Sequence, residues 1–337
     1  MKALIIGIDG QDGYYLTEFL QKKGYEVYGI VRKKSGIKHN VFDFQTEHQY
    51  HQIFADLMDF SSIMNAIEES APDEIYNFAG QSEIPLSWRQ PMITAEVNAL
   101  GVMRLLEAIR FVNPKIRLFQ ASSSEMFGRN PNQPLNENSV FMPRNPYGTA
   151  KLFAHWCIAD YREKYGLFCT SGVLFNHESP RRGVEFVTRK ITKAAAAIAL
   201  GRQEYLELGD LNAVRDWGYA GDYVRAMWMM LQQPEPKDYI IATGVGHTVR
   251  DFATYAFEKA GINLTWTGTG FDEVAVDTSN GKTVIRVSQQ FYRNQPNDII
   301  LADAQKIQNE LGFTLEYTFE KMIDMIVQSD IQMLAER

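Results

Sequence analysis

The chain contains little cysteine and no long apolar run. Cys157 and Cys169 are the only cysteines among 337 residues, and they do not have the spacing of metal ligands. Their scarcity excludes a disulfide-rich secreted scaffold and favours a reducing cytoplasm. No apolar stretch approaches the ~20 residues that span a bilayer, and the N-terminus lacks the pattern of a signal peptide. We therefore expect a cytoplasmic protein with no membrane span and no metal site.

An excess of positive charge is also lacking. The chain has 34 Lys and Arg against 41 Asp and Glu, a formal net charge of -7. This balance argues against general binding to nucleic acid. The chain is 45% hydrophobic, shows no internal repeat and is long enough for one large domain or two closely joined ones.

Strands and helices are expected to alternate through the first half of the chain. Short apolar runs predict strands at residues 2–6, 25–31, 51–57, 73–80, 116–122 and 167–175. Helical spacing predicts helices at 15–24, 61–70, 93–112 and 147–165, the second of them capped by a serine. This alternation predicts an α/β fold with a Rossmann-type, doubly wound parallel sheet.

The alternation loosens after Phe175. We expect helices at 187–201 and 223–232, a strand at 238–245 and an irregular stretch at 265–300. The sequence thus predicts a Rossmann domain and a smaller, mixed C-terminal substrate domain that is interleaved with it. The expected bounds are 1–175, with return segments near 210–245, and 176–337.

Three glycines, Gly7, Gly10 and Gly13, separate the first strand from the first helix. Glycines in such a turn allow a tight bend, close approach of a pyrophosphate and close packing of the helix on the strand. The helix N-terminus also presents amide donors to phosphates. We therefore predict a dinucleotide site that includes Gln11 and Asp12 of the same loop, with a purely structural turn as the alternative.

Basic residues follow the second strand, where an NAD-dependent enzyme usually carries an acid. Arg32, Lys33 and Lys34 suit a 2′-phosphate and favour NADP as the cofactor. The alternative is a solvated basic turn. Asp56 and Leu57, which follow the third strand, are predicted to border the adenine.

The motif NPYGTAK places Tyr147 and Lys151 one helical turn apart on the same face. Ser122 to Glu125 follow the fifth strand, so they emerge at the same sheet edge, where open α/β sheets bind ligands. Each of these residues has an ordinary explanation when taken alone, such as a turn-capping serine or a solvated carboxylate. Together with the glycine loop, they indicate a catalytic site.

These side chains fit one chemistry. Tyrosine titrates at about 10, but the ammonium of Lys151 and a positive nicotinamide ring favour the phenolate. The phenolate of Tyr147 then removes a proton from a substrate hydroxyl as hydride leaves the same carbon, and Ser123 is expected to hydrogen-bond that oxygen. Glu125 is surplus to alcohol oxidation. It indicates a second step, in which a carboxylate removes a proton alpha to the new carbonyl and assists loss of water.

A basic cluster lies in the second half of the chain. It contains Arg181, Arg182, Arg189, Lys190 and Lys193, of which Arg189 and Lys193 lie one helical turn apart. A solvated helix face is one explanation. Because the net charge is negative, a diphosphate partner explains the cluster better.

Longer motifs carry a resemblance to a known family. The G-x-x-G-x-x-G loop with a downstream Y-x-x-x-K is similar to the extended short-chain dehydrogenase/reductase superfamily. Within it, the chain resembles the GDP-mannose 4,6-dehydratase family, from Met1 to about Gly261 and again weakly near YRNQPND. The motifs that carry this resemblance are GQDG, FQASSSEMFG, NPYGTAK, LFNHESPRRGVEFVTRKIT, RDWGYAGDYV and IATG.

The resemblance implies a reaction and the residues that perform it. It implies oxidation of a GDP-sugar at C4, elimination of water across C5 and C6 and return of the hydride to C6, with NADP regenerated in each turnover. Arg182 and the loop after the second strand are implied to meet a neighbouring subunit's cofactor site, as in a homodimer or homotetramer. The implied catalytic residues are Ser123, which stands where threonine is common, Glu125, Tyr147 and Lys151, and the implied substrate-binding residues are Asn176, Val187, Lys190, Arg215 and Arg293.

Departures from the family pattern leave alternatives. RNQP at 293–296 replaces Arg-Pro-Ala-Glu, RKKSG replaces RRSS, and Gly80 and Glu83 replace alanine and histidine. The reaction type is therefore more firmly indicated than the substrate. The alternatives are a dehydratase for another GDP-sugar such as GDP-manno-heptose, a nucleotide-sugar reductase or epimerase, and a non-catalytic NADP-sensing protein.

Overall fold

The chain forms two compact units. The computed structural model describes residues 1–32, 49–131, 133–291 and 299–336. Unit 1 comprises Met1–Phe175, Ala220–Ala242 and Asp303–Thr314, and unit 2 comprises Asn176–Tyr219, Thr243–Ala302 and Leu315–Arg337. The chain therefore leaves unit 1 and returns to it twice. Of the helices that the described residues form, none is both long enough and apolar enough to cross a membrane.

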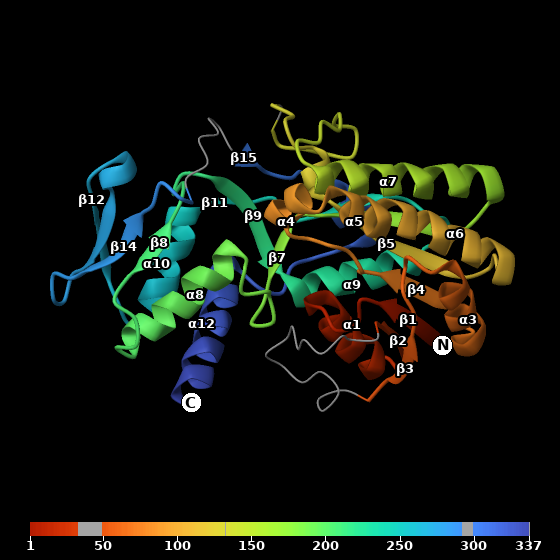
Figure 1. Ribbon diagram of the computed structural model, residues 1–337, viewed down its shortest axis with the longest axis horizontal. Helices are drawn as coiled ribbons and strands as arrows, with labels where there is room; N and C mark the ends of the chain where they lie inside the picture. Colours follow the sequence, from red (N-terminus) through yellow and green to blue (C-terminus); the bar gives the residue numbers. More distant parts are fainter. Residues whose placement is uncertain (33–48, 132, 292–298, 337) are drawn as a thin grey trace. The chain divides into compact units, whose positions relative to one another are not determined.

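A seven-stranded parallel sheet forms the middle of unit 1 (Figure 1). Its strands are β1 (Lys2–Ile6), β2 (Glu26–Val31), β3 (His51–Phe54), β4 (Glu74–Asn77), β5 (Arg117–Ser123), β6 (Cys169–Leu174) and β10 (Tyr239–Ile241). They lie in the order β10-β6-β5-β4-β1-β2-β3, and all neighbours are parallel. Strands buried on both faces require near-continuous apolar runs, which is why these segments are recognisable in the sequence.

Helices cover both faces of this sheet. On one face α1 (Gln11–Lys22) packs against α9 (Ala220–Leu231), and on the other lie α3 (Phe60–Ser70), α6 (Gly101–Val112) and α7 (Pro146–Tyr165) (Figure 1). Leu4, Ile75, Leu105 and Ile158 belong to the core on the α7 side. The prediction of a doubly wound α/β fold is confirmed. Unit 1 also contains α4 (Ile84–Arg89), α5 (Pro91–Ala95), the π-helical turn η1 (Glu96–Leu100), the 3-10 turn η2 (Ser124–Met126) and α11 (Gln305–Leu311).

The described residues of unit 2 form two small mixed sheets and three longer helices. One sheet is formed by β7 (Asn176–Glu178), β9 (Val214–Tyr219), β11 (Gly246–Thr248) and β15 (Ile299–Ile300), and the other by β8 (Leu206–Leu208), β12 (Leu264–Thr267), β13 (Val274–Asp277) and β14 (Thr283–Val287). The helices are α8 (Val187–Ala199), α10 (Val249–Lys259) and α12 (Phe319–Ala335), with a 3-10 turn η3 (Gly270–Asp272). Ile191, Phe252, Ile285 and Ile323 lie in the core of this unit.

Two helices begin differently from the expectation, each for a local reason. α1 begins at Gln11, earlier than expected, because Gly10 takes the extended N-cap conformation directly after the loop. α3 is capped by Asp59 and not by a serine, since the Asp59 carboxylate accepts hydrogen bonds from the amides of Ser61 and Ser62. Aspartate and serine are comparably good N-caps, so the pattern did not distinguish them.

The expectation of an irregular stretch at 265–300 is wrong over residues 265–287, and residues 292–298 of that stretch lie outside the described part of the chain. β12, β13 and β14 form an antiparallel meander there, with Trp266 opposite Ala275. Each strand has only four or five residues. So short an alternation gives little periodic signal in the sequence.

Arg189 of the basic cluster is used inside unit 2. It lies on α8, is 2% exposed and donates two hydrogen bonds to the carboxylate of Asp330 on α12, one of them at 2.7 Å. Asp330 is 1% exposed. A guanidinium that is buried and paired in this way is not available to a diphosphate, so the expectation for Arg189 is wrong.

We expect Asp330→Ala to lower the free energy of unfolding by about 3–5 kcal/mol, because it leaves the Arg189 guanidinium buried and unpaired. Asp324 is an exposed carboxylate on the same helix and supplies the control. Asp324→Ala should change the free energy by less than about 0.5 kcal/mol. Urea unfolding followed by circular dichroism measures both. Similar losses in the two variants would show that the buried pair is not the cause.

Candidate active site

Glycines shape the turn between β1 and α1. Gly7 has a φ of +85°, and a Cβ placed on it would lie 2.8 Å from the backbone nitrogen of Ala79. A Cβ on Gly13 would lie 2.4 Å from the carbonyl oxygen of Ile8, so α1 rests directly on the loop backbone. The N-cap of α1 is Gly10, and no side chain caps its first turn. This bare cradle at a helix N-terminus fits the pyrophosphate of a nicotinamide dinucleotide.

The other predicted cofactor residues also follow the carboxyl ends of β1, β2 and β3. Gln11 donates a side-chain hydrogen bond of 3.2 Å to Asp12 in the first turn of α1. Arg32 directly follows β2 and is exposed. Asp56 accepts a hydrogen bond of 2.9 Å from the amide two residues later, and the side chain of Leu57 is 4% exposed and packed in the core.

Ser123 and Glu125 lie where β5 ends. Ser123 is the last residue of the strand, is 8% exposed, and its Oγ accepts a hydrogen bond of 3.2 Å from the amide of Glu125. The 3-10 turn η2 then changes the chain direction and leaves Glu125 half-buried. A hydroxyl and a carboxylate are thereby held two residues apart at the edge of the sheet.

Helix α7 supplies Tyr147 and Lys151. Its N-cap is Asn145, whose Oδ1 accepts a hydrogen bond of 2.7 Å from the amide of Gly148. Pro146 occupies the first helical position, where its missing amide costs nothing. Tyr147 is half-buried, and the Nζ of Lys151 lies 5.8 Å from the centre of its ring. The structure therefore brings together the predicted phenol and ammonium.

Lys151 is a buried cation. Its side chain is 5% exposed, and Nζ donates a hydrogen bond of 2.8 Å to the carbonyl oxygen of Ala121 on β5. Burial lowers the pKa of Lys151 to about 8, while the charge of Asp12 acts in the opposite direction. At neutral pH the side chain is still mainly cationic, and a cation beside Tyr147 favours the phenolate.

The acid and the helix are joined directly. The Nδ2 of Asn145 donates a hydrogen bond of 2.8 Å to the Oε2 of Glu125. A Cβ on Gly148 would lie 2.5 Å from the carbonyl oxygen of Glu125, so the first turn of α7 packs on the backbone of η2. Asn145 stands in the NPYGTAK motif, but its contact with Glu125 was not predicted.

A second asparagine near Lys151 was also missed. Asn98 lies in η1, and its side chain forms two hydrogen bonds of 2.8 Å with the backbone of Gln81 after β4. A Cβ on Gly80 would lie 2.9 Å from the Oδ1 of Asn98 and 3.7 Å from the Nζ of Lys151. π-Helical turns inside helices often mark functional sites. The sequence predicted one continuous helix at 93–112, so the π-helical turn was not expected.

The predicted substrate residues lie in unit 2. Asn176 begins β7 and Arg215 lies on β9, and both are half-buried. Val187 begins α8 and is 38% exposed. Lys190 is exposed on the same helix, and its Nζ lies 5.2 Å from the ring centre of Phe291. Arg293, Lys33 and Lys34 lie outside the described residues.

Arg182 makes contacts within its own unit. Its Nε lies 3.4 Å from the Oε2 of Glu178, and its guanidinium lies 3.6 Å from the ring centre of Phe186. Glu178 also accepts a hydrogen bond of 2.6 Å from Thr188. These contacts order the segment between β7 and α8 that carries Arg181 and Arg182.

Comparison with known proteins identifies the relatives of this chain. The family model described as GDP-mannose 4,6 dehydratase matches residues 4–326. The chain belongs to the GDP-mannose 4,6-dehydratase family. It is 44% identical over 340 residues to the GDP-mannose 4,6-dehydratase of Sinorhizobium fredii (strain HH103), covering 98% of this chain and 97% of that protein. It is also 44% identical to the Drosophila melanogaster protein of that name, covering 98% of this chain and 86% of the relative.

Solved structures of low sequence identity share the fold of this chain. The structure of RMD from Pseudomonas aeruginosa complexed with NADPH is 21% identical with a TM-score of 0.78, covering 99% of this chain and 100% of that one. The dTDP-glucose 4,6-dehydratase from Bacillus anthracis in complex with NAD is 21% identical with a TM-score of 0.79, covering 98% and 96%. At this identity the likeness establishes the fold alone.

The lowered pKa of Lys151 predicts a pH dependence of stability in this family member. Between about 8, the folded value, and 10.5, the ordinary value, the unfolded chain holds a proton that the folded chain has lost. The stability of the wild type relative to Lys151→Met should therefore rise with pH across this window, by up to about 1.4 kcal/mol per pH unit, and should not change below it. Denaturant unfolding of both proteins at a series of pH values measures the difference. A constant difference across the window would contradict the lowered pKa.

Proposed function

We propose that the chain catalyses the NADP-dependent 4,6-dehydration of GDP-mannose to GDP-4-keto-6-deoxymannose. The observation that carries the proposal is the hydrogen bond between Glu125 and Asn145, the N-cap of the helix with Tyr147 and Lys151. An alcohol dehydrogenase of this type needs a phenol, a cation and a hydroxyl. A carboxylate fixed beside that set adds the group that an elimination requires. Membership of the GDP-mannose 4,6-dehydratase family supports the same reaction.

The first step removes two hydrogens from C4 of the sugar. Tyr147, as phenolate, takes the proton of the C4 hydroxyl, and Ser123 donates a hydrogen bond to the same oxygen. Lys151 stabilises the phenolate with its charge. A nicotinamide cofactor held at the glycine loop would supply the hydride chemistry, as acceptor of the hydride from C4 and donor of the hydride to C6.

The second step is the loss of water. The C4 carbonyl acidifies the hydrogen on C5, and the carboxylate of Glu125 removes it as a proton. The C6 hydroxyl leaves with the proton that Glu125 took from C5, so that one water is lost and a C5–C6 double bond forms. Addition of hydride at C6, and of the proton that Tyr147 took from the C4 hydroxyl at C5, then leaves a methyl group at C6. Glu125 therefore acts as base at C5 and then as acid at the C6 hydroxyl.

The cofactor preference rests on the end of β2. Arg32 is exposed directly after that strand, where a carboxylate would bind the ribose hydroxyls of NAD. A guanidinium instead suits the 2′-phosphate of NADP. We place Gly7, Gly10, Gln11, Asp12, Gly13, Arg32, Asp56, Leu57, Tyr147 and Lys151 in the NADP site.

The domain roles follow from the division of the chain. We assign NADP binding to residues 1–175 with the return segment within 210–245, and nucleotide-sugar binding to residues 176–337. Lys190 supports this assignment, because it is an exposed cation on α8 that can bind a diphosphate. Arg189 on the same helix cannot do so, since it is paired with Asp330. Asn176, Val187, Lys190, Arg215 and Arg293 are the proposed contacts to GDP-mannose.

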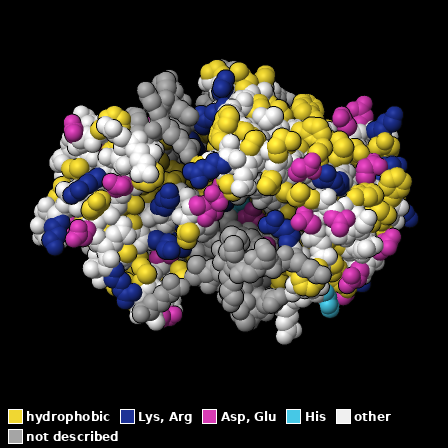
Figure 2. Space-filling model, viewed as in Figure 1, with side chains coloured by type: hydrophobic (Ala, Val, Ile, Leu, Met, Phe, Trp, Pro, Cys, Tyr) yellow, Lys and Arg dark blue, Asp and Glu magenta, His cyan; other side chains and the backbone are white. Residues whose placement is uncertain are grey.

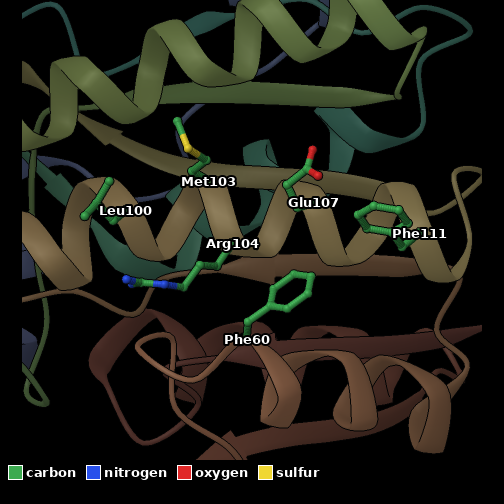
Figure 3. A pocket seen from close by; sticks show the side chains of 6 residues that line it. All are labelled: Phe60, Leu100, Met103, Arg104, Glu107 and Phe111. Carbon is green, nitrogen blue, oxygen red and sulfur yellow. The ribbon is translucent and has the colours of Figure 1, made fainter.

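An apolar surface on unit 1 supports a homo-oligomer. Met92 on α5, Phe111 on α6 and Trp156 on α7 are 75%, 60% and 55% exposed, and hydrophobic side chains gather over these helices (Figure 2). A hollow of about 390 Å³ lies between α3 and α6, with Phe60 pointing from α3 toward α6 (Figure 3). It is lined by Phe60, Leu100, Met103, Arg104, Glu107 and Phe111. Since monomers rarely expose large apolar patches, we assign this surface to a second copy of the chain, in a homodimer or homotetramer.

The cysteines support the cytoplasm as the compartment. Cys157 and Cys169 are both buried and free. A reducing environment preserves thiols in this state. We therefore place the enzyme in the cytoplasm, where it acts on a soluble nucleotide sugar.

We expect purified protein with NADP to convert GDP-mannose to a product lighter by one water, as measured by mass spectrometry. Glu125→Gln should still bind the cofactor but should lose dehydration by a factor of roughly 10²–10⁴, because the acid and base of the elimination is gone. Glu163→Gln, an exposed change on α7, is the control and should retain activity.

Other outcomes would revise this function in different ways. Water loss from another GDP-sugar but not from GDP-mannose would keep the mechanism and reject the substrate. Oxidation without water loss in the wild type would favour a reductase or epimerase. Full biological activity of Tyr147→Phe would favour a non-catalytic NADP-sensing protein.

We expect Arg32→Ala to raise the Kd for NADP by about ten- to a hundredfold, because a charge-assisted contact to the 2′-phosphate is lost. The Kd for NAD, which lacks that phosphate, should not change. Titration calorimetry with each cofactor measures both values. Lys22→Ala at the exposed end of α1 is the control. An unchanged NADP affinity in Arg32→Ala would contradict the assignment of this residue.

A further inference from the structure

Asn145 contacts two parts of the proposed active site at once. Its Oδ1 accepts the amide hydrogen of Gly148 at 2.7 Å, and its Nδ2 donates to the Oε2 of Glu125 at 2.8 Å. The side chain is 6% exposed. One small amide therefore closes the N-terminus of α7 and holds the carboxylate that follows β5.

The orientation of this amide is fixed by its own hydrogen bonds. The Gly148 amide can only donate, so the oxygen of Asn145 must face it. The NH₂ group must then face the carboxylate of Glu125, which accepts. A rotation of the amide by half a turn would break both contacts and set like groups against each other. The cap of α7 thus determines where the donor for Glu125 lies.

The carboxylate keeps one oxygen for chemistry. Its Oε2 is bound by Asn145, and among the described residues no side chain or amide hydrogen-bonds to Oε1. A donor on one oxygen limits rotation of the group. This leaves Oε1 directed and available to take a proton.

The backbone limits movement at the same place. The position of the missing Gly148 side chain is occupied by the carbonyl oxygen of Glu125, 2.5 Å from the ideal Cβ. α7 and η2 therefore cannot shift independently near this point without changing the Asn145 contact. Tyr147 lies within the same first turn of α7.

We infer that Asn145 is a positioning residue. It aligns the carboxylate of Glu125 for removal of the C5 proton while the phenol of Tyr147 acts at C4. Asn145 does not touch the substrate in this role. It acts through the carboxylate, and it matters for the elimination rather than for the first oxidation. The inference rests on the proposed dehydration of GDP-mannose.

Two substitutions separate this role from helix capping. Aspartate and serine are N-caps comparable to asparagine, so Asn145→Asp and Asn145→Ser keep the cap of α7. Both remove the amide donor to Glu125, and the aspartate also places a second carboxylate beside it. Asn145→Ser should melt near the wild-type temperature, whereas the adjacent carboxylates in Asn145→Asp should lower the melting temperature. Asn130→Ser, which removes a buried amide bonded to the carbonyl of Val140, is the matched control.

The test follows the two steps separately under single-turnover conditions with NADP and GDP-mannose. In both Asn145 variants the oxidation at C4 should persist, while water loss slows by about ten- to a hundredfold, because a poorly placed group loses much of its effect. Reduced nicotinamide should then accumulate and be visible by its absorbance. In the Asn145 variants, GDP-mannose deuterated at C5 should react more slowly than unlabelled substrate. This isotope effect should be larger in the variants than in the wild type.

A purely structural role predicts a different pattern. A loosened α7 would displace Tyr147 and Lys151, so that the first oxidation slows, no reduced nicotinamide accumulates and C5 deuteration has no added effect. That result, or unchanged rates in both steps, would overturn the inference. The Asn130→Ser control should behave as the wild type in both kinetic steps and in the isotope effect.

A measurement without substrate separates this inference from the proposed function. The melting temperatures of Asn145→Ser, Glu125→Ala and the double variant should be non-additive, because each single substitution removes the hydrogen bond that the two side chains share. Additive shifts would overturn the inference whatever the substrate is. Wild-type protein that binds NADP but does not dehydrate GDP-mannose would instead overturn the proposed function, even with non-additive shifts.

Discussion

The candidate site depends on the direct packing of the first turn of α7 against the backbone of η2. At Gly148 there is no room for a side chain, because the carbonyl oxygen of Glu125 lies 2.5 Å from the ideal Cβ. This close approach places a helix start and a strand end at the same edge of the sheet. The phenol of Tyr147 at the helix start and the carboxylate of Glu125 at the strand end therefore keep a fixed position relative to each other. Multistep chemistry on neighbouring carbons requires this.

The second constraint is the burial of a charge. Lys151 is held under the edge of β5 by the carbonyl oxygen of Ala121, in surroundings that disfavour its ammonium form. Burial of the ammonium lowers the stability of the fold. The same low polarity strengthens the electrostatic effect of the Lys151 charge on Tyr147. Asp12, at the start of α1, partly offsets the cost. The glycine loop and the catalytic helix are thus coupled electrostatically as well as by the sheet between them.

Much of unit 1 could be predicted from the sequence because buried parallel strands give apolar runs and their ends carry the functional motifs. The glycine loop and NPYGTAK are therefore recognisable without coordinates. The roles of Asn145 and Asn98 were not predictable, because each depends on one contact between segments distant in the chain. Arg189 was expected to bind a diphosphate with the rest of the basic cluster, but it is paired with Asp330 inside unit 2. No local sequence pattern indicates that Asp330 is its partner. The strands of unit 2 were missed because they are short, and one of them, β14, also pairs with β8, a strand distant in the chain.

A crystal structure with bound NADP and an unreactive analogue of GDP-mannose tests the central claim most directly. We predict the Oε1 of Glu125 facing C5 of the sugar, the phenol oxygen of Tyr147 facing the C4 oxygen, and the Asn145 hydrogen bond to Oε2 retained. A sugar bound with Glu125 turned away from C5, or with the Tyr147 oxygen far from C4, would contradict the proposed mechanism.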